Sequence, residues 1–403
     1  MEGYNKKVIM SYWTICRMKT TKKIYVKVSI IFLLGGILLF SSCEKEENQK
    51  IEANRKTLFM YLPWSSNLTN YFYNNISDLE KCITKIGLNN EKVIVFISTG
   101  STEAMMFEIV SSHGRCKREI LKKYKSPPFT TIDGITAILN DVKAFAPASV
   151  YTMIIGCHGM GWLPVYEMKV RSAPHMKMHW EYQGVPLTRY FGGLTAEYQT
   201  DIKSLASGIA NAGMKMEYIL FDDCYMSSIE VAYELKDVTK YLIGSTSEMM
   251  AYGMPYAAIG EYLLGNPDYQ SGCEEFYNFY STYEIMPCGT LAVTDCSELE
   301  NMAAIIKSIN SKYSFDKSLR GTIQRLDGYT PVIFYDFADY ITSLCNDPIL
   351  LNQFREQLNH LVPYKTHTKN FYTMAKGIIP INTFSGITTS DPSDNPMTVL
   401  KEN

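Results

Sequence analysis

Residues 218–235, YILFDDCYMSSIEVAYEL, show the order of strand, polar loop and helix on which an α/β fold is built. This stretch begins inside an apolar run over 216–221 that is rich in aromatic and β-branched residues, and such a run predicts a buried strand. Two aspartates and Cys224 follow, and the apolar spacing over 226–235 then predicts a helix. The cysteine is therefore expected between the carboxyl end of a strand and the start of a helix.

A second stretch, YTMIIGCHGMGWLP at residues 151–164, has a similar pattern. Residues 149–156 predict another buried strand, and His158 follows it closely. Alternation along the chain turns Cys157 to the opposite face from His158, where a small buried cysteine suits the core. Ligands of an open α/β sheet bind outside the carboxyl ends of its strands. If the two strands are neighbours, His158 and Cys224 come within hydrogen-bonding reach.

The same alternation of strands and helices extends over the first part of the chain. It predicts an α/β fold, with a mostly parallel sheet flanked by helices on both faces. Continuous apolar strands fit a sheet that is covered on both sides. Ser77, three residues before Glu80, resembles a capping box. The strands are expected at 57–62, 92–98, 105–110, 149–156, 216–221 and 240–244, and the helices at 71–86, 132–145, 201–211 and 226–235.

The pattern is less regular after about residue 265. A strand is expected at 289–294, a helix at 297–313 and a strand-like run at 332–335, followed by helices through 361. This half is interpreted as an elaboration packed on the sheet or as a small second domain. The chain is accordingly divided into a leader (1–43), a flexible tether (44–56), the domain that carries both stretches (57–265) and a C-terminal α/β extension (266–403).

The pairing of Cys224 with His158 has a chemical purpose. A thiol with a pKa of about 8.5 is mostly protonated at neutral pH, and a nearby imidazole takes its proton or stabilises the thiolate. A helix that starts after Cys224 favours a negative sulfur. The backbone N–H groups of Gly159 and Cys224 are candidates for the oxyanion hole. Either side chain alone is more often structural, but two of them at strand ends, with glycines and acids around them, favour catalysis.

These motifs resemble those of the clostripain-like cysteine peptidases, which belong with caspases, gingipains and legumains. The resemblance is carried by His158-Gly159-x-Gly161-Trp162 and by Asp222-x-Cys224-x-Met226 with the helix that follows it. It extends more loosely from residue 57 to about 256. It implies a caspase-like fold with His158 as the catalytic base and Cys224 as the nucleophile. The expected partners are protein or peptide substrates.

Family members typically cleave after Arg or Lys, and Asp222 occupies the matching acidic position. The alternative role for Asp222 is an N-cap of the following helix. The family often supplies a second acid from the loop after the next strand, which here contains Ser245, Thr246 and Ser247. Ser245 and Glu248 are the candidate substrate-binding residues of that loop. Other readings are a different P1 preference (the residue before the cleaved bond), or a lipid-anchored binding module that lacks activity.

The irregular segment 164–193 separates the two motifs. Clostripain-like enzymes are often cleaved between them, and Lys169, Arg171 and Lys177 are candidate sites. The alternative is an ordinary exposed loop that contains basic residues.

The N-terminus reads as an export signal. A basic segment at 18–27, an apolar run of about 13 residues and Ser-Ser-Cys43 resemble a bacterial lipobox, in which Cys43 receives a lipid. An uncleaved anchor and a plain secretory signal are the alternatives, and Met18 is an alternative start. The acidic tether resembles the surface-export signal of Bacteroidetes lipoproteins. The expected location is the outer membrane, facing the surface or the periplasm.

Composition and residue spacing give little support to nucleic acid, disulfides or metals. A net charge of -2 does not favour nucleic acid as a partner, which would need a concentrated basic face. The ten cysteines include no CxxC pair, so incomplete disulfide pairing, or none, is expected. His175 and His179 have helical spacing, but Pro174 and the lack of a paired acid argue against zinc. No cofactor is expected; some family members need calcium, for which this chain shows no motif.

Overall fold

The computed structural model describes residues 54–65, 68–157, 159–163, 184 and 198–393. The described residues all belong to one compact unit. The predicted leader, most of the tether and most of the segment 164–193 lie outside the described residues, as does His158.

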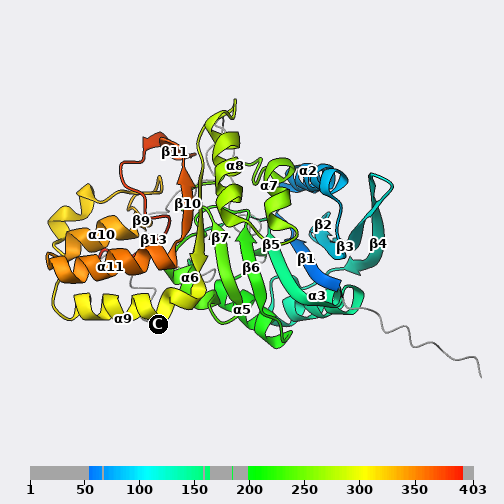
Figure 1. Ribbon diagram of the computed structural model, residues 1–403, viewed down its shortest axis with the longest axis horizontal. Coiled ribbons are helices and arrows are strands. Elements are labelled where there is room, and N and C mark those ends of the chain that lie inside the picture. The colour runs from blue at the N-terminus through cyan, green and yellow to red at the C-terminus, as the bar shows by residue number, and fades with distance from the viewer. Residues whose placement is uncertain (1–53, 66–67, 158, 164–183, 185–197, 394–403) are drawn as a thin grey trace, which may run out of the picture. The chain divides into compact units, whose positions relative to one another are not determined.

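A nine-stranded sheet forms the centre of this unit, in the order β10-β8-β7-β6-β5-β1-β2-β3-β4 (Figure 1). The five central strands are parallel, and both edges of the sheet are antiparallel. The prediction of a mostly parallel α/β sheet is therefore confirmed. The central strands are β1 (Asn54–Leu62), β2 (Glu91–Ser98), β5 (Ala148–Ile155), β6 (Met216–Phe221) and β7 (Thr239–Gly244), and the outer ones are β3 (Glu103–Ser112), β4 (Arg115–Lys125), β8 (Thr290–Asp295) and β10 (Tyr364–His367).

Helices cover both faces of the sheet because the strands are apolar on both faces. In β1, Phe59 and Tyr61 join one core, whereas Leu58 and Met60 join the other. The first core also contains α3 (Ile132–Phe145), α5 (Ile202–Asn211) and α6 (Ile229–Leu235), and the second contains α2 (Thr69–Ile86), α7 (Tyr256–Leu263) and α8 (Tyr269–Ser281). Figure 1 shows these two helical layers with the strands between them.

Residues 266–393 continue the same sheet through β8 and β10. They also form two small two-stranded sheets, β11 with β12 and β13 with β9. Helices α9 to α11 pack into the core that contains α6. These elements are α9 (Leu299–Asn310), α10 (Phe337–Leu344), α11 (Pro348–Leu361), β9 (Tyr335–Asp336), β11 (Asn370–Thr373), β12 (Gly377–Pro380) and β13 (Thr388–Thr389), with short 3-10 turns at Cys296–Glu298 and Lys317–Thr322.

Two local predictions are wrong. Ser77 lies inside α2 and donates a hydrogen bond to the Tyr73 carbonyl, so it caps no helix. Glu80 instead forms an ion pair with Arg118 of β4. The helix expected from 226 begins only at Ile229, because Ser228 in extended conformation accepts the N–H of Val231 and caps it.

Among the described residues, none of the helices combines the length and the apolar character that crossing a bilayer requires.

Candidate active site

The nucleophile candidate lies in the loop that follows β6. Cys224 is completely buried, and its Sγ accepts a hydrogen bond from the N–H of Met249 at 3.1 Å. The loop after β7 runs beside it, since Tyr225 N–H donates to the Ser247 carbonyl and Ser227 N–H to the Ser245 carbonyl. A backbone N–H directed at a sulfur stabilises negative charge on it. The sequence predicted that a helix N-terminus would stabilise the sulfur, but α6 begins only five residues after Cys224. The N–H of Met249 contacts the sulfur instead.

The loop that carries the histidine lies directly against the cysteine loop. On one side of position 158, the N–H of Cys157 donates to Asp223 Oδ1 at 2.6 Å. On the other side, a Cβ added to Gly159 would lie 2.0 Å from the Cys224 carbonyl oxygen. Only a glycine permits that approach. His158 itself lies outside the described residues. Its neighbour Cys157 bonds to Asp223, and its neighbour Gly159 packs on the backbone of Cys224.

The prediction that Cys157 belongs to the core is confirmed. Its side chain is 1% exposed within the same core as α3 and α5. Its Sγ also lies 3.4 Å from Asp223 Oδ2. Asp223 therefore uses both carboxylate oxygens to join the ends of β5 and β6.

Asp222 is buried beneath the loop that precedes α7. Its Oδ1 accepts the N–H of Met254 at 2.8 Å, and its Oδ2 accepts the hydroxyl of Tyr256 at 2.9 Å. The alternative role of helix N-cap is wrong, because Ser228 occupies that position. Both carboxylate oxygens of Asp222 therefore accept hydrogen bonds from residues 254 and 256.

The two other predicted substrate-binding residues are engaged in hydrogen bonds. Ser245 Oγ lies 2.7 Å from Thr290 Oγ1 of β8. Glu248 is 3% exposed, and its Oε1 accepts the Tyr225 hydroxyl at 2.8 Å while its Oε2 accepts the N–H of Met374 at 3.0 Å. The structure therefore places both side chains inside the loop framework around Cys224.

Tyr225 is a site residue that the sequence reasoning missed. It has a φ of +61°, a left-handed conformation that non-glycine residues seldom adopt. Its ring stacks on Phe334 with centroids 4.7 Å apart. Burial, followed by the nearby Glu248, raises the pKa of Tyr225 well above its usual value. The phenol therefore remains a hydrogen-bond donor over the physiological pH range.

A buried carboxylate fixes the loop that carries Phe334. Asp327 accepts N–H bonds from Tyr329, Ile333 and Phe334 at 2.6 to 2.7 Å. Burial raises the pKa of Asp327 to about 6 despite these bonds. A Cβ on Gly161 would lie 2.8 Å from the Phe334 ring, so the same loop also packs on the histidine loop.

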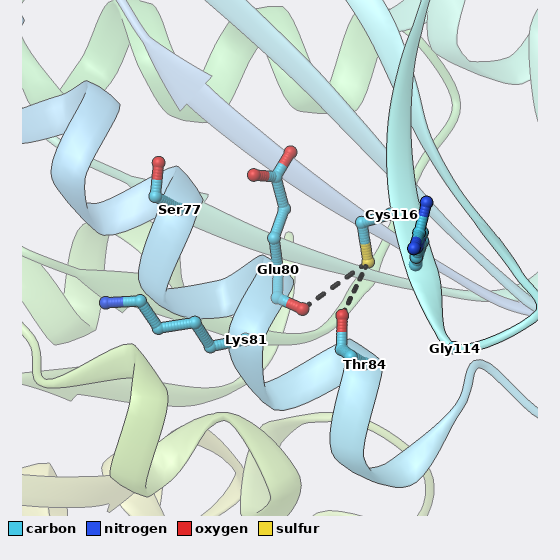
Figure 2. Close-up of a pocket in the computed structure, with 7 residues that line it drawn as sticks. Ser77, Glu80, Lys81, Thr84, Gly114 and Cys116 are labelled. Atoms are coloured by element: carbon cyan, nitrogen blue, oxygen red, sulfur yellow. Dashed lines mark hydrogen bonds between the residues drawn. The ribbon is translucent and has the colours of Figure 1, made fainter.

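A groove of about 560 Å³ lies elsewhere, between α2 and the start of β4 (Figure 2). Cys116 Sγ donates to the Glu80 carbonyl at 3.4 Å and lies equally far from Thr84 Oγ1. None of the residues that line the groove belongs to the loops after β5, β6 or β7.

Across the part of the chain that the structure describes, His, Cys, Asp and Glu side chains form no group of three that could hold a metal ion. His175 and His179 lie outside this part.

A mixed α/β sheet whose cysteine loop packs against the loop that follows the neighbouring strand suits a cysteine hydrolase. The family model of the Clostripain family (Peptidase_C11) matches residues 60–376, and the chain belongs to this family. It is a cysteine peptidase.

Solved structures of relatives agree with this assignment. A secreted C11 cysteine protease from Bacteroides thetaiotaomicron, "iotapain", is 58% identical, with a TM-score of 0.80 over 87% of this chain and 97% of the other. A clostripain from Bacteroides thetaiotaomicron ATCC 29148, solved in complex with the peptide inhibitor BTN-VLTK-AOMK, is 65% identical over 53% of this chain and 96% of its own, with a TM-score of 0.52. An inactive zymogen C11 protease from Parabacteroides distasonis, 24% identical over 86% of this chain and 94% of its own, shares the fold with a TM-score of 0.70. The comparison with curated proteins gives no match.

Proposed function

We propose that this peptidase hydrolyses peptide bonds after Arg or Lys, with Cys224 as nucleophile and His158 as base. One observation carries the proposal: both chain neighbours of His158 contact the loop of Cys224.

The proposed reaction proceeds through a thioester. The imidazole takes the thiol proton, and the thiolate attacks the carbonyl carbon of the substrate. The N–H groups of Gly159 and Cys224 are the proposed donors to the oxyanion. The imidazolium then protonates the departing amine as the C–N bond breaks. Water, activated by the neutral imidazole, hydrolyses the thioester and restores the thiol. The proposal uses no metal ion or other cofactor.

Asp222 is the proposed partner of the basic P1 side chain. It lies two residues before the nucleophile, and its carboxylate is held in place by the Met254 N–H and the Tyr256 hydroxyl. The 65% identical clostripain was solved with BTN-VLTK-AOMK, in which lysine precedes the AOMK group, and this supports a basic P1 residue here. Ser245 is proposed to hold the loop after β7 in place through its hydrogen bond with Thr290 of β8.

The P1 assignment is tested with fluorogenic peptides that differ only at P1. We expect the wild-type protein to cleave the Arg and Lys peptides at least about 100-fold faster than Gln or norleucine peptides, since a charge-assisted pair contributes about 3 kcal/mol. Equal rates across the panel would remove the basic preference while leaving the peptidase assignment intact. Repeating the panel with calcium and with EDTA tests whether a metal is required.

We also propose that the protein is exported and anchored to the outer membrane by a lipid on Cys43, facing the surface or the periplasm. The support is the basic and apolar leader before Cys43 and the likeness to a protease described as secreted. Mass spectrometry of the mature N-terminus is expected to find acylated Cys43, and Cys43→Ala is expected to release the protein from the membrane fraction. An intact Met18 peptide in the mature protein would refute the lipid anchor.

A further inference from the structure

We propose that Glu248 is a positioning residue, which holds the backbone N–H of Met249 against the sulfur of Cys224. The proposal deepens the proposed function, on which it rests for its kinetic test. It gives Glu248 a part different from the substrate binding that the sequence indicates.

The contacts of Glu248 form a closed ring around the nucleophile. Its Oε1 accepts the hydroxyl of Tyr225, the residue after Cys224, at 2.8 Å. Its main chain leads directly to Met249, whose N–H donates to Cys224 Sγ at 3.1 Å. The ring therefore runs from the carboxylate through Tyr225 and Cys224 to Met249 and back. The carboxylate is thus linked to that N–H both along the chain and through Tyr225 and Cys224.

The conformation of Tyr225 requires this support. A tyrosine at a φ of +61° persists only where its surroundings hold it in place. The stacking of its ring on Phe334, at 4.7 Å and 12° between planes, holds one end of the side chain. The hydrogen bond from its hydroxyl to Glu248 holds the other end.

The second oxygen of Glu248 connects the site to the C-terminal half. Oε2 accepts the N–H of Met374, in the turn between β11 and β12. The Phe334 ring comes from the loop that Asp327 fixes. The C-terminal half thus contributes two of the contacts that hold Tyr225 and Glu248, although it supplies none of the proposed reacting groups.

The test compares two replacements of one side chain. In Glu248→Gln, the amide oxygen can accept the Met374 N–H while the NH₂ group donates to the Tyr225 oxygen, so both contacts survive without the charge. We expect kcat and the P1 preference to stay within about threefold of wild type. In Glu248→Ala both contacts are lost, and we expect kcat to fall about 10- to 100-fold with little change in KM. Tyr225→Phe, which removes one hydroxyl, is expected to move kcat in the same direction by less.

A second measurement needs no substrate. The rate at which iodoacetamide alkylates Cys224 is read by peptide mapping in a Cys116→Ser background, because Cys116 is the partly exposed cysteine of the described residues. We expect Glu248→Ala to slow alkylation and Glu248→Gln to preserve it. Because this readout is independent of hydrolysis, it tests Glu248 even if the wild-type protein cleaves no Arg or Lys peptide.

Two outcomes would overturn the proposal. A selective loss of Arg and Lys cleavage in Glu248→Gln would show that Glu248 reads the P1 charge. Unchanged kcat and alkylation in both Glu248→Ala and Tyr225→Phe would show that the ring does not position the sulfur. Thermal melting shows whether a loss of kcat in Glu248→Ala comes instead from a failure of that variant to fold.

Discussion

Cys224→Ala is expected to lower kcat/KM for peptide hydrolysis by about 10⁴-fold or more, because the residue supplies the only atom proposed to attack the substrate. The variant keeps the Cβ and should keep the fold, since Gly159 packs against the backbone of residue 224 rather than its sulfur. His158→Ala is expected to lose a comparable amount, and the double variant little more, because the two act as one unit. Progress curves with the best peptide of the P1 panel measure the effect.

Cys296→Ala is the matched control. This cysteine is also buried, and burial first, then Asp295, raises its pKa to about 12. Its replacement is expected to cost about 1 kcal/mol in the free energy of unfolding through lost packing, with kcat unchanged. A Cys224→Ala protein that is folded and as active as the control would exclude Cys224 as nucleophile.

Asp222→Asn is expected to reduce kcat/KM for Arg and Lys peptides about 30- to 150-fold while leaving thermal stability close to wild type. The amide oxygen can still accept the Met254 N–H, and the NH₂ group can donate to the Tyr256 oxygen, so the loop before α7 keeps its supports. What is lost is the negative charge opposite a P1 cation, and a hydrogen bond to a charged group contributes about 2–3 kcal/mol. Parallel kinetics and melting curves measure both effects.

The contrast with two other variants makes this result specific. Asp222→Ala also removes the loop supports, so it should lower the melting temperature as well as the activity. Glu248→Gln, the removal of a neighbouring buried charge, is expected to leave the P1 preference unchanged. A neutral-P1 peptide should be cleaved equally by Asp222→Asn and wild type. An equal loss on charged and neutral peptides would remove Asp222 from P1 recognition.

The sequence predicted the central sheet well because its strands are apolar on both faces. The bounds expected for β6 and α3 agree with the structure, and the other central strands agree within a few residues.

The strands at the edges of the sheet are harder to predict from the sequence. β4 reads RCKREILKKYK, and its residues are mostly exposed. Charge on an edge strand prevents pairing with other chains, and it also hides the apolar pattern that identifies a strand. β10 has only four residues and is partly buried, so it has too few apolar positions for the sequence to predict a strand.

The sequence predicted only those residues of the candidate site that directly follow a strand. Cys224, His158 and Asp222 follow apolar runs in the sequence, and the strands formed by those runs, β5 and β6, are parallel neighbours in the sheet. Phe334 and Met374 reach the site from more than a hundred residues away, and their neighbours in the chain carry no chemical motif. Met249 contacts the sulfur through its backbone N–H, which every residue except proline has, so the residue type does not indicate this role.

The buried cysteines have a consequence for the handling of this protein. The eight described cysteines form no disulfide with one another, and burial, the main cause, raises the pKa of Cys82 and Cys288 to about 11 and that of Cys273 to about 12. Thiols that remain protonated exchange slowly with oxidised glutathione. The domain should therefore mature without an isomerase, and it should be recoverable from a reducing cytoplasm with no oxidative refolding step.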